Sequence, residues 1–525
     1  MPYGAYDKRK GEYGVSISDT KPNSSGPAAI HRAIQDAEVI DFPECHGGGN
    51  WGPQDLELTH NARNDIGNAE RLRERFGHDL LCVRGLGWHV WTGTHWELDG
   101  GEEAVKIRAQ QTAVAIRREV KAIGANPPKN VGQKELDEMI ESHSKWAVCS
   151  GNSNRLTSMV TEARAHLTES SDVMDANPLL VNVKNGTLEI KGACETLMPH
   201  DRADRISKVI DVVYDPDATC PRFDTFLKRV QPDADVRLFL QRWFGYCLTG
   251  LTHEQKLVFF FGEGANGKSV MVDVMSRIMG AYSISLPFTS LLRDDNKGGG
   301  DASPDLARLP GARFVRASEP EKGSRFSEAM IKAVTGGEQM TVRQLRKEFF
   351  DFVPQFKLTL SGNHKPRVMG QDHGIWRRLK LVPWPVIIPE REWDTELVHK
   401  LFAERSGIFN WMLDGARMYL EKGLCAPEAI EAATKEYRTD SDPLGQFVAG
   451  CVEFAPGARV QGADMYSAYV AFCRANGEQP WKQRTFGDGL SERGFKKDRV
   501  GGYVFYIGVR LVNVPTPHTG NDDPD

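Results

Sequence analysis

Apolar side chains change their spacing along the chain, and these changes predict a series of different elements. Residues 1–58 are rich in Gly, Pro, Ser and Asp and have no apolar period, which predicts a flexible tail or linker. Residues 233–250 carry apolar side chains at helical spacing up to Gly250, which predicts an amphipathic helix. The continuous apolar run Leu257–Phe261 follows and predicts a buried strand.

Alternating positions and turn residues predict a mixed α+β domain over residues 59–214. Residues 80–99 alternate aromatic and polar side chains around a Thr-Gly pair, as a β-hairpin does. A long helix is expected over Glu102–Ala122, and a second hairpin is expected at the Asn185-Gly186 turn. Three tryptophans of the first hairpin either form its core or stack on bases, namely Trp88, Trp91 and Trp96.

The predicted strand runs directly into a glycine-rich loop. The loop consists of Gly262, Glu263, Gly264, Ala265, Asn266, Gly267, Lys268 and Ser269. Its glycines allow a tight turn whose N–H groups face phosphates, Lys268 reaches the outer phosphates, and the Ser269 hydroxyl is a ligand for Mg²⁺. Apolar residues at helical spacing follow, so strand, loop and helix stand in the order that a P-loop requires. The chain is therefore expected to bind and hydrolyse ATP with Mg²⁺.

Further polar groups are expected around the triphosphate. Such an ATPase needs an acid after a second strand to hold Mg²⁺ and polarise water, and Glu319 follows a short apolar segment, with Glu321 in reserve. Asn363 ends a third apolar segment and is expected to bind the attacking water or the outer phosphate. One of Arg377 and Arg378 is expected as an arginine finger for a neighbouring subunit. The alternatives are surface turns for the acid and amide, and a solvated helix end for the arginines.

The order of these motifs resembles a known helicase family. The glycine-rich loop is followed by Ala-Ser-Glu319, Ile331-Lys-Ala-Val-Thr-Gly-Gly-Glu, Ser-Gly-Asn363-His-Lys-Pro and Trp-Arg-Arg. Upstream matches are Gly67-Asn-Ala-Glu-Arg-Leu, Asn182-Val-Lys-Asn-Gly-Thr-Leu, Tyr214-Asp-Pro and Phe244-Gly-Tyr-Cys-Leu-Thr-Gly. Over residues 60–385 the chain resembles superfamily 3 helicases, and among them the phage and plasmid primase-helicases that include relatives of the poxvirus primase-helicase.

This resemblance implies an α/β fold with an AAA+-like P-loop ATPase core over residues 215–440. Family members form rings, usually hexamers, that translocate on single-stranded DNA, so single-stranded and forked DNA are the expected partners of this chain. The resemblance also implies that Glu319 is the Walker B acid and Asn363 the sensor 1 residue. Arg377 or Arg378 would then act in trans across a subunit interface.

Two basic segments are the candidate DNA contacts. In the family, a hairpin between the Walker B acid and sensor 1 carries basic residues at its tip, and here that tip is expected at Arg346 and Lys347. Residues 441–514 show three helical patterns followed by two strands, which predicts a winged helix. Its basic side chains are expected to bind duplex or origin DNA: Lys482, Arg484, Lys496, Lys497 and Arg499. The alternatives are a solvated basic turn and a protein contact.

Composition narrows the class of protein further. The formal net charge of -5 gives no global indication of nucleic-acid binding, so any such binding depends on local basic surfaces. The 9 cysteines include no CxxC pair, which predicts reduced thiols in a cytoplasm, here that of a bacterial host cell. No apolar run approaches the roughly 18 residues of a membrane span, so no membrane partner is expected.

The expected function is that of a replicative DNA helicase of a phage, plasmid or mobile element. Many family members carry an upstream primase domain, for which the first 58 residues show no candidate, so a separate primase is a possible partner. Residues 515–525 are expected to be an acidic disordered tail. The alternative function is a non-unwinding P-loop ATPase that acts as an origin-binding initiator or loader. A DNA-packaging motor is less favoured, because no nuclease-like carboxylate cluster follows the ATPase segment.

Overall fold

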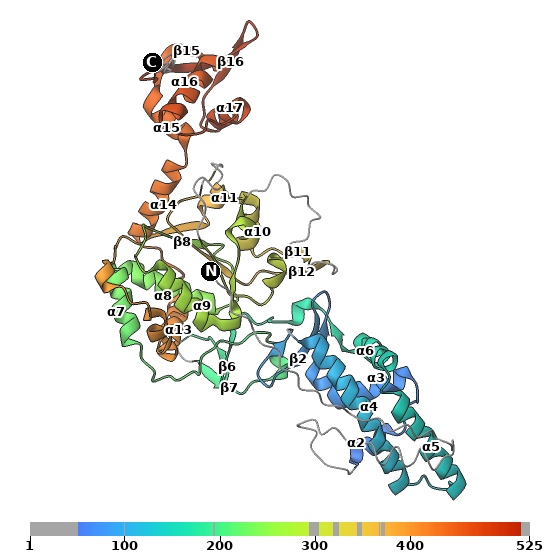
Figure 1. Cartoon of the computed structure of the whole chain (residues 1–525). Helices are drawn as coiled ribbons and strands as arrows, with labels where there is room; N and C mark the ends of the chain where they lie inside the picture. Colours follow the sequence, from blue (N-terminus) through green and yellow to red (C-terminus); the bar gives the residue numbers. More distant parts are fainter. Residues whose placement is uncertain are drawn as a thin grey trace, which may run out of the picture.

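A five-stranded parallel sheet lies in the central part of the chain (Figure 1). Its strand order is β14-β8-β13-β10-β9, with bounds Leu379–Pro383, Leu257–Phe261, Lys357–Gly362, Phe314–Ser318 and Ser283–Ser285. Leu257 of β8 is in register with Leu358 of β13 and with Leu379 of β14. Because all neighbouring pairs are parallel, the carboxyl ends of the strands meet at one edge of the sheet.

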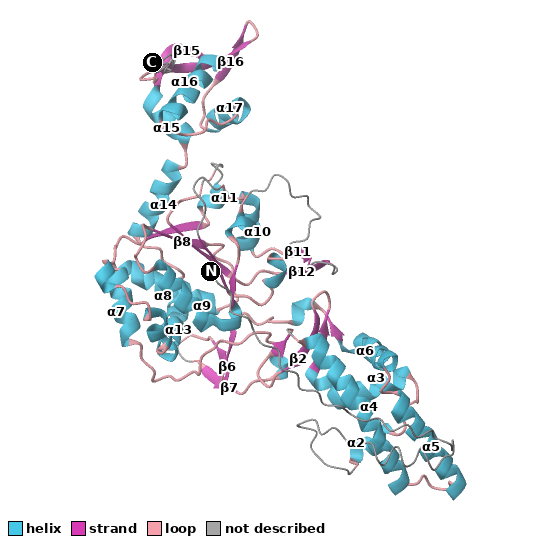
Figure 2. Cartoon of the chain, viewed as in Figure 1, coloured by secondary structure: helices cyan, strands magenta, loops and turns pink. Residues whose placement is uncertain are grey.

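The computed structural model describes residues 51–98, 100–192, 195–292, 304–318, 325–343, 349–366, 368 and 373–515. Three parts follow one another along the chain, and helix α14, Glu428–Asp440, leads from the central part to the last one (Figure 1). Figure 2 shows helices and strands alternating in the central part, which makes the chain a mixed α/β protein as expected. Among the described residues, no helix has the length and apolarity that crossing a membrane requires.

Alternate side chains of β8 enter two different cores. Val258 and Phe260 pack with α7, α8, α9, α12 and α13, which span Pro221–Val230, Ala234–Leu248, Lys268–Met279, Leu397–Phe402 and Arg405–Lys422. Leu257 and Phe259 face the opposite core, which includes residues of α10, α11, β11 and β12, spanning Glu328–Gly336, His373–Trp376, Met340–Arg343 and Phe349–Phe352. All four side chains are fully buried, as expected for a parallel strand covered on both faces.

The N-terminal part combines a small sheet with helices. Its strands have the order β3-β2-β1-β4, with bounds Trp96–Glu97, Gly87–Trp91, Leu80–Val83 and Thr168–Glu169. Its main helices are α3 to α6, with bounds Asp65–Phe76, Gly101–Ala125, Gln133–Cys149 and Ser153–Leu167, so the predicted long helix is confirmed. Trp88 and Trp96 are 0% and 1% exposed, which favours core packing over base stacking for both.

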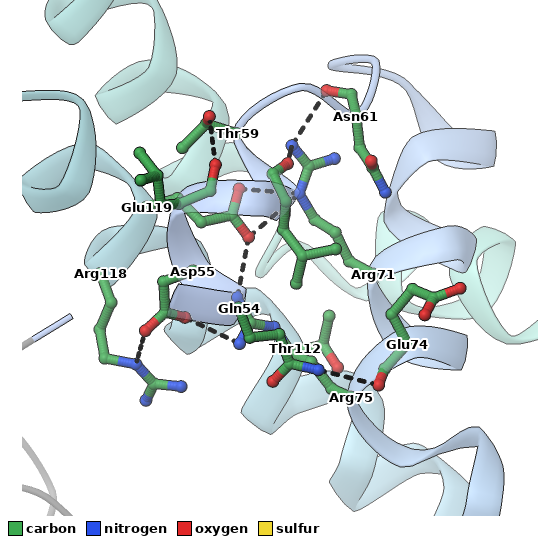
Figure 3. A network of polar contacts seen from close by, with 12 residues as sticks. Gln54, Asp55, Thr59, Asn61, Arg71, Glu74, Arg75, Thr112, Arg118 and Glu119 are labelled. Carbon is green, nitrogen blue, oxygen red and sulfur yellow. Dashed lines mark hydrogen bonds and ion pairs between the residues drawn. The ribbon is translucent and has the colours of Figure 1, made fainter. Parts of the chain in front are cut away.

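Helix α2, Pro53–Leu58, corrects the expected extent of the flexible tail, which included these residues. Its Asp55 is buried and forms ion pairs with Arg75 at 2.8 Å and with Arg118 at 3.2 Å (Figure 3). A buried carboxylate requires such partners, and they hold this short helix against α3 and α4. Residues 1–50 lie outside the described part of the chain.

Glu119 of α4 is the centre of the same ionic network. Its fully buried carboxylate accepts hydrogen bonds from Arg71 Nε at 2.9 Å, Arg75 Nη2 at 3.0 Å and His143 Nε2 at 3.0 Å. Burial alone would raise the pKa of Glu119, but the hydrogen bond from His143 and the charge of Arg71 outweigh it and lower the pKa. The network joins α3, α4 and α5 through one carboxylate.

The Gly-Asn-Ala-Glu-Arg-Leu stretch of the sequence has a packing role. A Cβ atom on Gly67 would lie 1.9 Å from the carbonyl oxygen of Ala62, so only glycine fits there. The Asn68 amide donates to Ser150 Oγ at 3.0 Å and accepts from Trp146 Nε1 at 3.0 Å. These contacts help to pack α3 against α5 and the segment that follows it.

A small antiparallel sheet joins the N-terminal part to the central one. Its strands β5, β6 and β7 span Leu180–Val183, Gly186–Glu189 and Thr196–Met198. The pairing of Val183 with Gly186 confirms the hairpin predicted at Asn185-Gly186.

The C-terminal unit differs from the predicted order by one additional strand. Its elements are α15, β15, α16, α17, β16 and β17, with bounds Pro443–Cys451, Val452–Gln461, Gly462–Ala475, Gln483–Glu492, Lys497–Val500 and Tyr503–Leu511. They form a three-stranded sheet of order β15-β17-β16 over a separate apolar core. Strand β15 was not predicted because a bulge between Phe454 and Arg459 interrupts its register and none of its side chains is buried, so the sequence shows no apolar alternation.

Candidate functional site

The loop over residues 262–269 follows β8 at the carboxyl edge of the central sheet. A Cβ atom on Gly262 would lie 2.4 Å from the carbonyl oxygen of Trp384, and one on Gly267 would lie 2.6 Å from Cγ1 of Val230. Gly267 also has a φ of +84°, which favours glycine. A Cβ atom on Gly264, in contrast, would meet nothing within 4 Å. Two of the three glycines are therefore required by their surroundings.

Asn266 and Lys268 fold the loop onto itself. The amide of Asn266 donates to the carbonyl oxygen of Glu263 at 2.5 Å. The ammonium group of Lys268 donates to the carbonyl oxygens of Gly262 at 2.6 Å and Glu263 at 3.2 Å, and to Oδ1 of Asn266 at 3.1 Å. These oxygens hold the lysine in the concave side of the loop, where phosphate oxygens are expected.

The environment of Lys268 favours binding of an anion. The residue is 5% exposed, and burial lowers the pKa of its ammonium group to about 8. Helix α9 begins at this lysine, so the N-terminal end of the helix dipole points at the same place. Ser269 is exposed in the first turn of α9, as a hydroxyl ligand of Mg²⁺ must be.

Asn363 meets Lys268 at the edge of the sheet. Oδ1 of Asn363 accepts a hydrogen bond of 3.1 Å from Lys268 Nζ. Gly362 pairs with Phe261 at the ends of β13 and β8, which places the residues that follow both strands side by side. The structure thus brings together two residues that the sequence placed in one site.

The predicted acid Glu319 and its reserve Glu321 lie outside the described residues. Strand β10 ends immediately before them at Ser318, which pairs with Ser361 of β13. The chain therefore leaves the sheet at the end of β10, which is next to β13, the strand that Asn363 follows, and at the same edge of the sheet.

Arg377 and Arg378 lie at the other edge of the sheet, where the strands begin. Leu257 at the start of β8 donates its N–H to the carbonyl oxygen of Arg378 at 2.8 Å. The arginines and the loop of the same chain therefore lie at opposite ends of β8. This strand has five residues, and at a rise of about 3.3 Å per residue its length is about 16 Å. Neither arginine is placed to contact a nucleotide on its own subunit.

The two arginines have different surroundings. Arg378 is 7% exposed and donates to Thr335 Oγ1 at 3.1 Å and to the carbonyl oxygen of Gly374 at 2.7 Å. Arg377 is exposed and donates to Gln255 Oε1 at 2.8 Å. Gln255 was missed in the sequence, because it belongs to no motif and its role depends on the fold.

The predicted DNA contacts divide into described and undescribed residues. Strands β11 and β12 pair as expected, but Arg346 and Lys347 lie outside the described part. In the C-terminal unit all five predicted basic side chains are exposed: Lys482, Arg484, Lys496, Lys497 and Arg499. Lys497 and Arg499 line a hollow of about 450 Å³ beside α17. Nζ of Lys497 also donates to the carbonyl oxygen of Gly487 at 2.8 Å, so its charge stays next to that helix.

Two family models match the chain on either side of the central sheet. The model described as D5 N terminal like matches residues 69–232, and the model described as Poxvirus D5 protein-like matches residues 439–506. The chain is a relative of the poxvirus D5-like primase-helicases. The matched segments of this D5-like chain include Glu119 with its partners Arg71, Arg75 and His143, and most of the C-terminal unit.

Relatives of the D5-like chain come from large DNA viruses. A protein of Acanthamoeba polyphaga mimivirus named as a helicase is 30% identical over 295 residues, which is 52% of this chain and 30% of that protein. A protein of African swine fever virus named as a primase is 22% identical over 328 residues, 58% of this chain and 34% of that protein. A helicase-named protein of Frog virus 3 is 25% identical over 274 residues, 48% of this chain and 28% of that protein. The matched region thus spans about a third of each relative.

Among solved structures, the apo C-terminal region of NrS-1 is similar to this chain at 12% sequence identity and a TM-score of 0.34. The match covers 57% of this chain and 77% of that one.

Proposed function

We propose that this D5-like chain is an ATP-dependent DNA helicase with an AAA+-like superfamily 3 core. The observation that carries the proposal is the 3.1 Å contact between Lys268 and Asn363 at the carboxyl edge of the parallel sheet. A lysine on the triphosphate and a polar side chain for the attacking water are what this chemistry needs at adjacent strand ends. The D5-like and helicase-named relatives support the same function.

ATP and Mg²⁺ are the proposed cofactors. Ser269 and Glu319 would hold Mg²⁺, because hydroxyl and carboxylate oxygens are its preferred ligands and both residues follow strands of the same sheet edge. The ion supplies charge neutralisation on the phosphates. Lys268 donates to the outer phosphate oxygens, Glu319 polarises the attacking water, and Asn363 orients that water by a hydrogen bond.

A ring of subunits completes the proposed site. Arg377 is the better candidate for the finger in trans, because it is exposed while Arg378 is buried and bonded within its own subunit. Both arginines lie too far from the loop of the same chain, so a finger has to reach a neighbouring subunit. A hexamer satisfies this requirement in the family that the motifs resemble.

DNA contacts are proposed at two places. The tip of the β11–β12 hairpin, with Arg346 and Lys347, would grip single-stranded DNA in the ring. The C-terminal unit would act as a winged helix, which its order α15-β15-α16-α17-β16-β17 supports, and its exposed Arg484 and Arg499 would bind duplex or origin DNA.

The test is a forked-duplex unwinding assay with the wild-type chain and Glu319→Gln. The wild type is expected to unwind the fork with ATP, and Glu319→Gln to bind ATP but turn it over poorly. Hydrolysis without unwinding would favour the second candidate, an origin-binding initiator or loader. Near-normal turnover by Glu319→Gln would transfer the Walker B role to Glu321.

A further inference from the structure

Strand β12 packs directly against the N-terminal part of the chain. Gly85, in the turn between β1 and β2, has a φ of +79°, and a Cβ atom on it would lie 2.3 Å from Cβ of Phe350. Oγ of Ser171 donates a hydrogen bond of 3.1 Å to the carbonyl oxygen of Asp351. Figure 1 shows β11 and β12 on the side of the central part that faces the N-terminal helices.

The contact continues into a shared apolar core. Phe350 and Phe352 are 6% and 9% exposed and belong to one cluster with Leu81 and Val83 of β1. The same cluster contains Phe259 of β8, which precedes the loop over residues 262–269. Strand β12 therefore lies between the N-terminal part and the sheet that carries the proposed ATP site.

The hairpin depends on such contacts for its orientation. Strands β11 and β12 form a sheet of two strands, paired only with each other among the described residues. An isolated two-stranded hairpin is at best marginally stable, so its direction is set by what packs on it. Three residues after the end of β12, the amide of Gln355 donates to the carbonyl oxygen of Asp175 at 2.9 Å, which is a further link to the N-terminal part.

We propose that the N-terminal part positions the β11–β12 hairpin for DNA through the close contact of Gly85 with Phe350. Gly85 and Ser171 are then positioning residues for the helicase reaction. This inference rests on the proposed function, because it assigns the hairpin to DNA. It gives the N-terminal part a role in coupling hydrolysis to DNA, in addition to any role in assembly.

The test compares Gly85→Ala with Gly93→Ala in the full chain. Both glycines have positive φ, at +79° and +94°, so both variants carry similar backbone strain. Only Gly85 is in contact, since a Cβ atom on Gly93 would meet nothing within 4 Å. Gly85→Ala is expected to raise the DNA concentration for half-maximal stimulation of ATPase activity by about fivefold to tenfold. Basal kcat and KM for ATP should stay at the wild-type values, and Gly93→Ala should change neither readout.

A double variant tests whether Gly85 acts through Phe350. In a Phe350→Ala background, Gly85→Ala is expected to change the DNA concentration for half-maximal stimulation less than it does in the wild type. The reason is that loss of the Phe350 side chain has already removed the contact between β12 and Gly85. If Gly85→Ala does not fold, Phe350→Leu carries the same expectation. Equal half-stimulating DNA concentrations for Gly85→Ala and Gly93→Ala, or full additivity in the double variant, would overturn the inference.

Hydrogen exchange separates this inference from the proposed function. The amides of β12 should exchange faster in Gly85→Ala than in Gly93→Ala, while those of β8 and β13 should not change. This readout needs no DNA. If the wild type shows no DNA-stimulated hydrolysis but the exchange difference is present, the helicase proposal fails and the contact remains. If exchange in β12 is unchanged, the positioning contact itself is refuted.

Discussion

Nζ of Lys268 lies 3.1 Å from Oδ1 of Asn363, although the two residues are 95 positions apart. Each follows a strand of the same sheet, and these strands are neighbours. The lysine is also held by the carbonyl oxygens of Gly262 and Glu263. Phosphate oxygens entering the loop would replace these acceptors. ATP binding would therefore exchange existing hydrogen bonds of the lysine for new ones and would not increase their number.

Two glycine variants test the shape of the loop. Gly262→Ala should abolish detectable ATP binding, because its Cβ atom would lie 2.4 Å from the carbonyl oxygen of Trp384 and displace the loop. Gly264→Ala is the matched control, since its Cβ atom would meet nothing within 4 Å. Its affinity should stay within about threefold of the wild type. Fluorescent-nucleotide titration measures both, and equal loss in the two variants would contradict the loop geometry.

The lowered pKa of Lys268 predicts a pH dependence of ATP binding. The ammonium group of Lys268 has a pKa of about 8 in the free protein, and a bound triphosphate stabilises its charged form. Above that pH, binding must take up a proton, so affinity should fall by up to about tenfold per pH unit. Well below it the lysine is already charged, and affinity should be flat with respect to this group. Calorimetry in buffers of different ionisation enthalpy measures the proton uptake. The Lys268→Arg variant should bind ATP without taking up a proton.

Arg377 and Arg378 should separate into a catalytic and a structural residue. Arg377→Ala should lower ATP turnover by about 10³-fold, as loss of a finger does, with an unchanged Tm. Arg378→Ala should lower the Tm, because the buried Thr335 hydroxyl and the carbonyl oxygen of Gly374 would lose the hydrogen bonds that Arg378 donates. Mixing Arg377→Ala with Lys268→Ala subunits should restore activity. Absence of rescue in mixed rings would argue against action in trans.

The central strands could be predicted from sequence because their signals are local. The apolar run Leu257–Phe261 became β8 without a change of bounds, and the helix after the loop begins at Lys268. Asn363 was found because a polar residue follows a buried strand. In each case neighbouring residues carry the pattern, so no knowledge of distant contacts is needed.

Other elements could not be predicted because distant contacts form them. Helix α2 has six residues, and its buried Asp55 is satisfied by Arg75 and Arg118 from other helices. Gln255 holds Arg377 across 122 positions without belonging to a motif. The contact of Gly85 with Phe350 likewise depends on how two parts of the chain pack, which no local period encodes.

The buried network around Glu119 should set the acid stability of the N-terminal part. The pKa values of Glu119 and Asp55 are lowered in the folded chain, so their stabilisation is present above their ordinary values. It should be lost as the pH falls below about 4.5, which denaturant melts at several pH values can follow. Glu119→Gln should flatten this acid dependence and destabilise the part by about 3 kcal/mol or more at pH 7, because Arg71 and Arg75 lose a buried partner.

A control for this prediction lies on the surface of α5. Glu141 pairs with Lys145 four residues on, and both side chains are more than half exposed. Glu141→Gln should therefore change the free energy of unfolding by no more than about 0.5 kcal/mol and leave the acid dependence intact. If the two variants have equal effects, the buried network does not determine the acid stability.

Basic residues of the C-terminal unit should differ in their effect on duplex binding. Arg484 and Arg499 are exposed, whereas Arg493 is held by Asp442 through Nη2, at 2.8 Å from each carboxylate oxygen. Arg484→Ala with Arg499→Ala should weaken duplex binding and reduce its salt slope by about 0.9 per lost phosphate contact. Arg493→Ala should lower the Tm of the unit and leave that slope unchanged. Fluorescence anisotropy from about 50 to 200 mM salt measures the slopes. An unchanged slope in the first variant would assign the unit to a protein contact, because its exposed cations would then touch no phosphate.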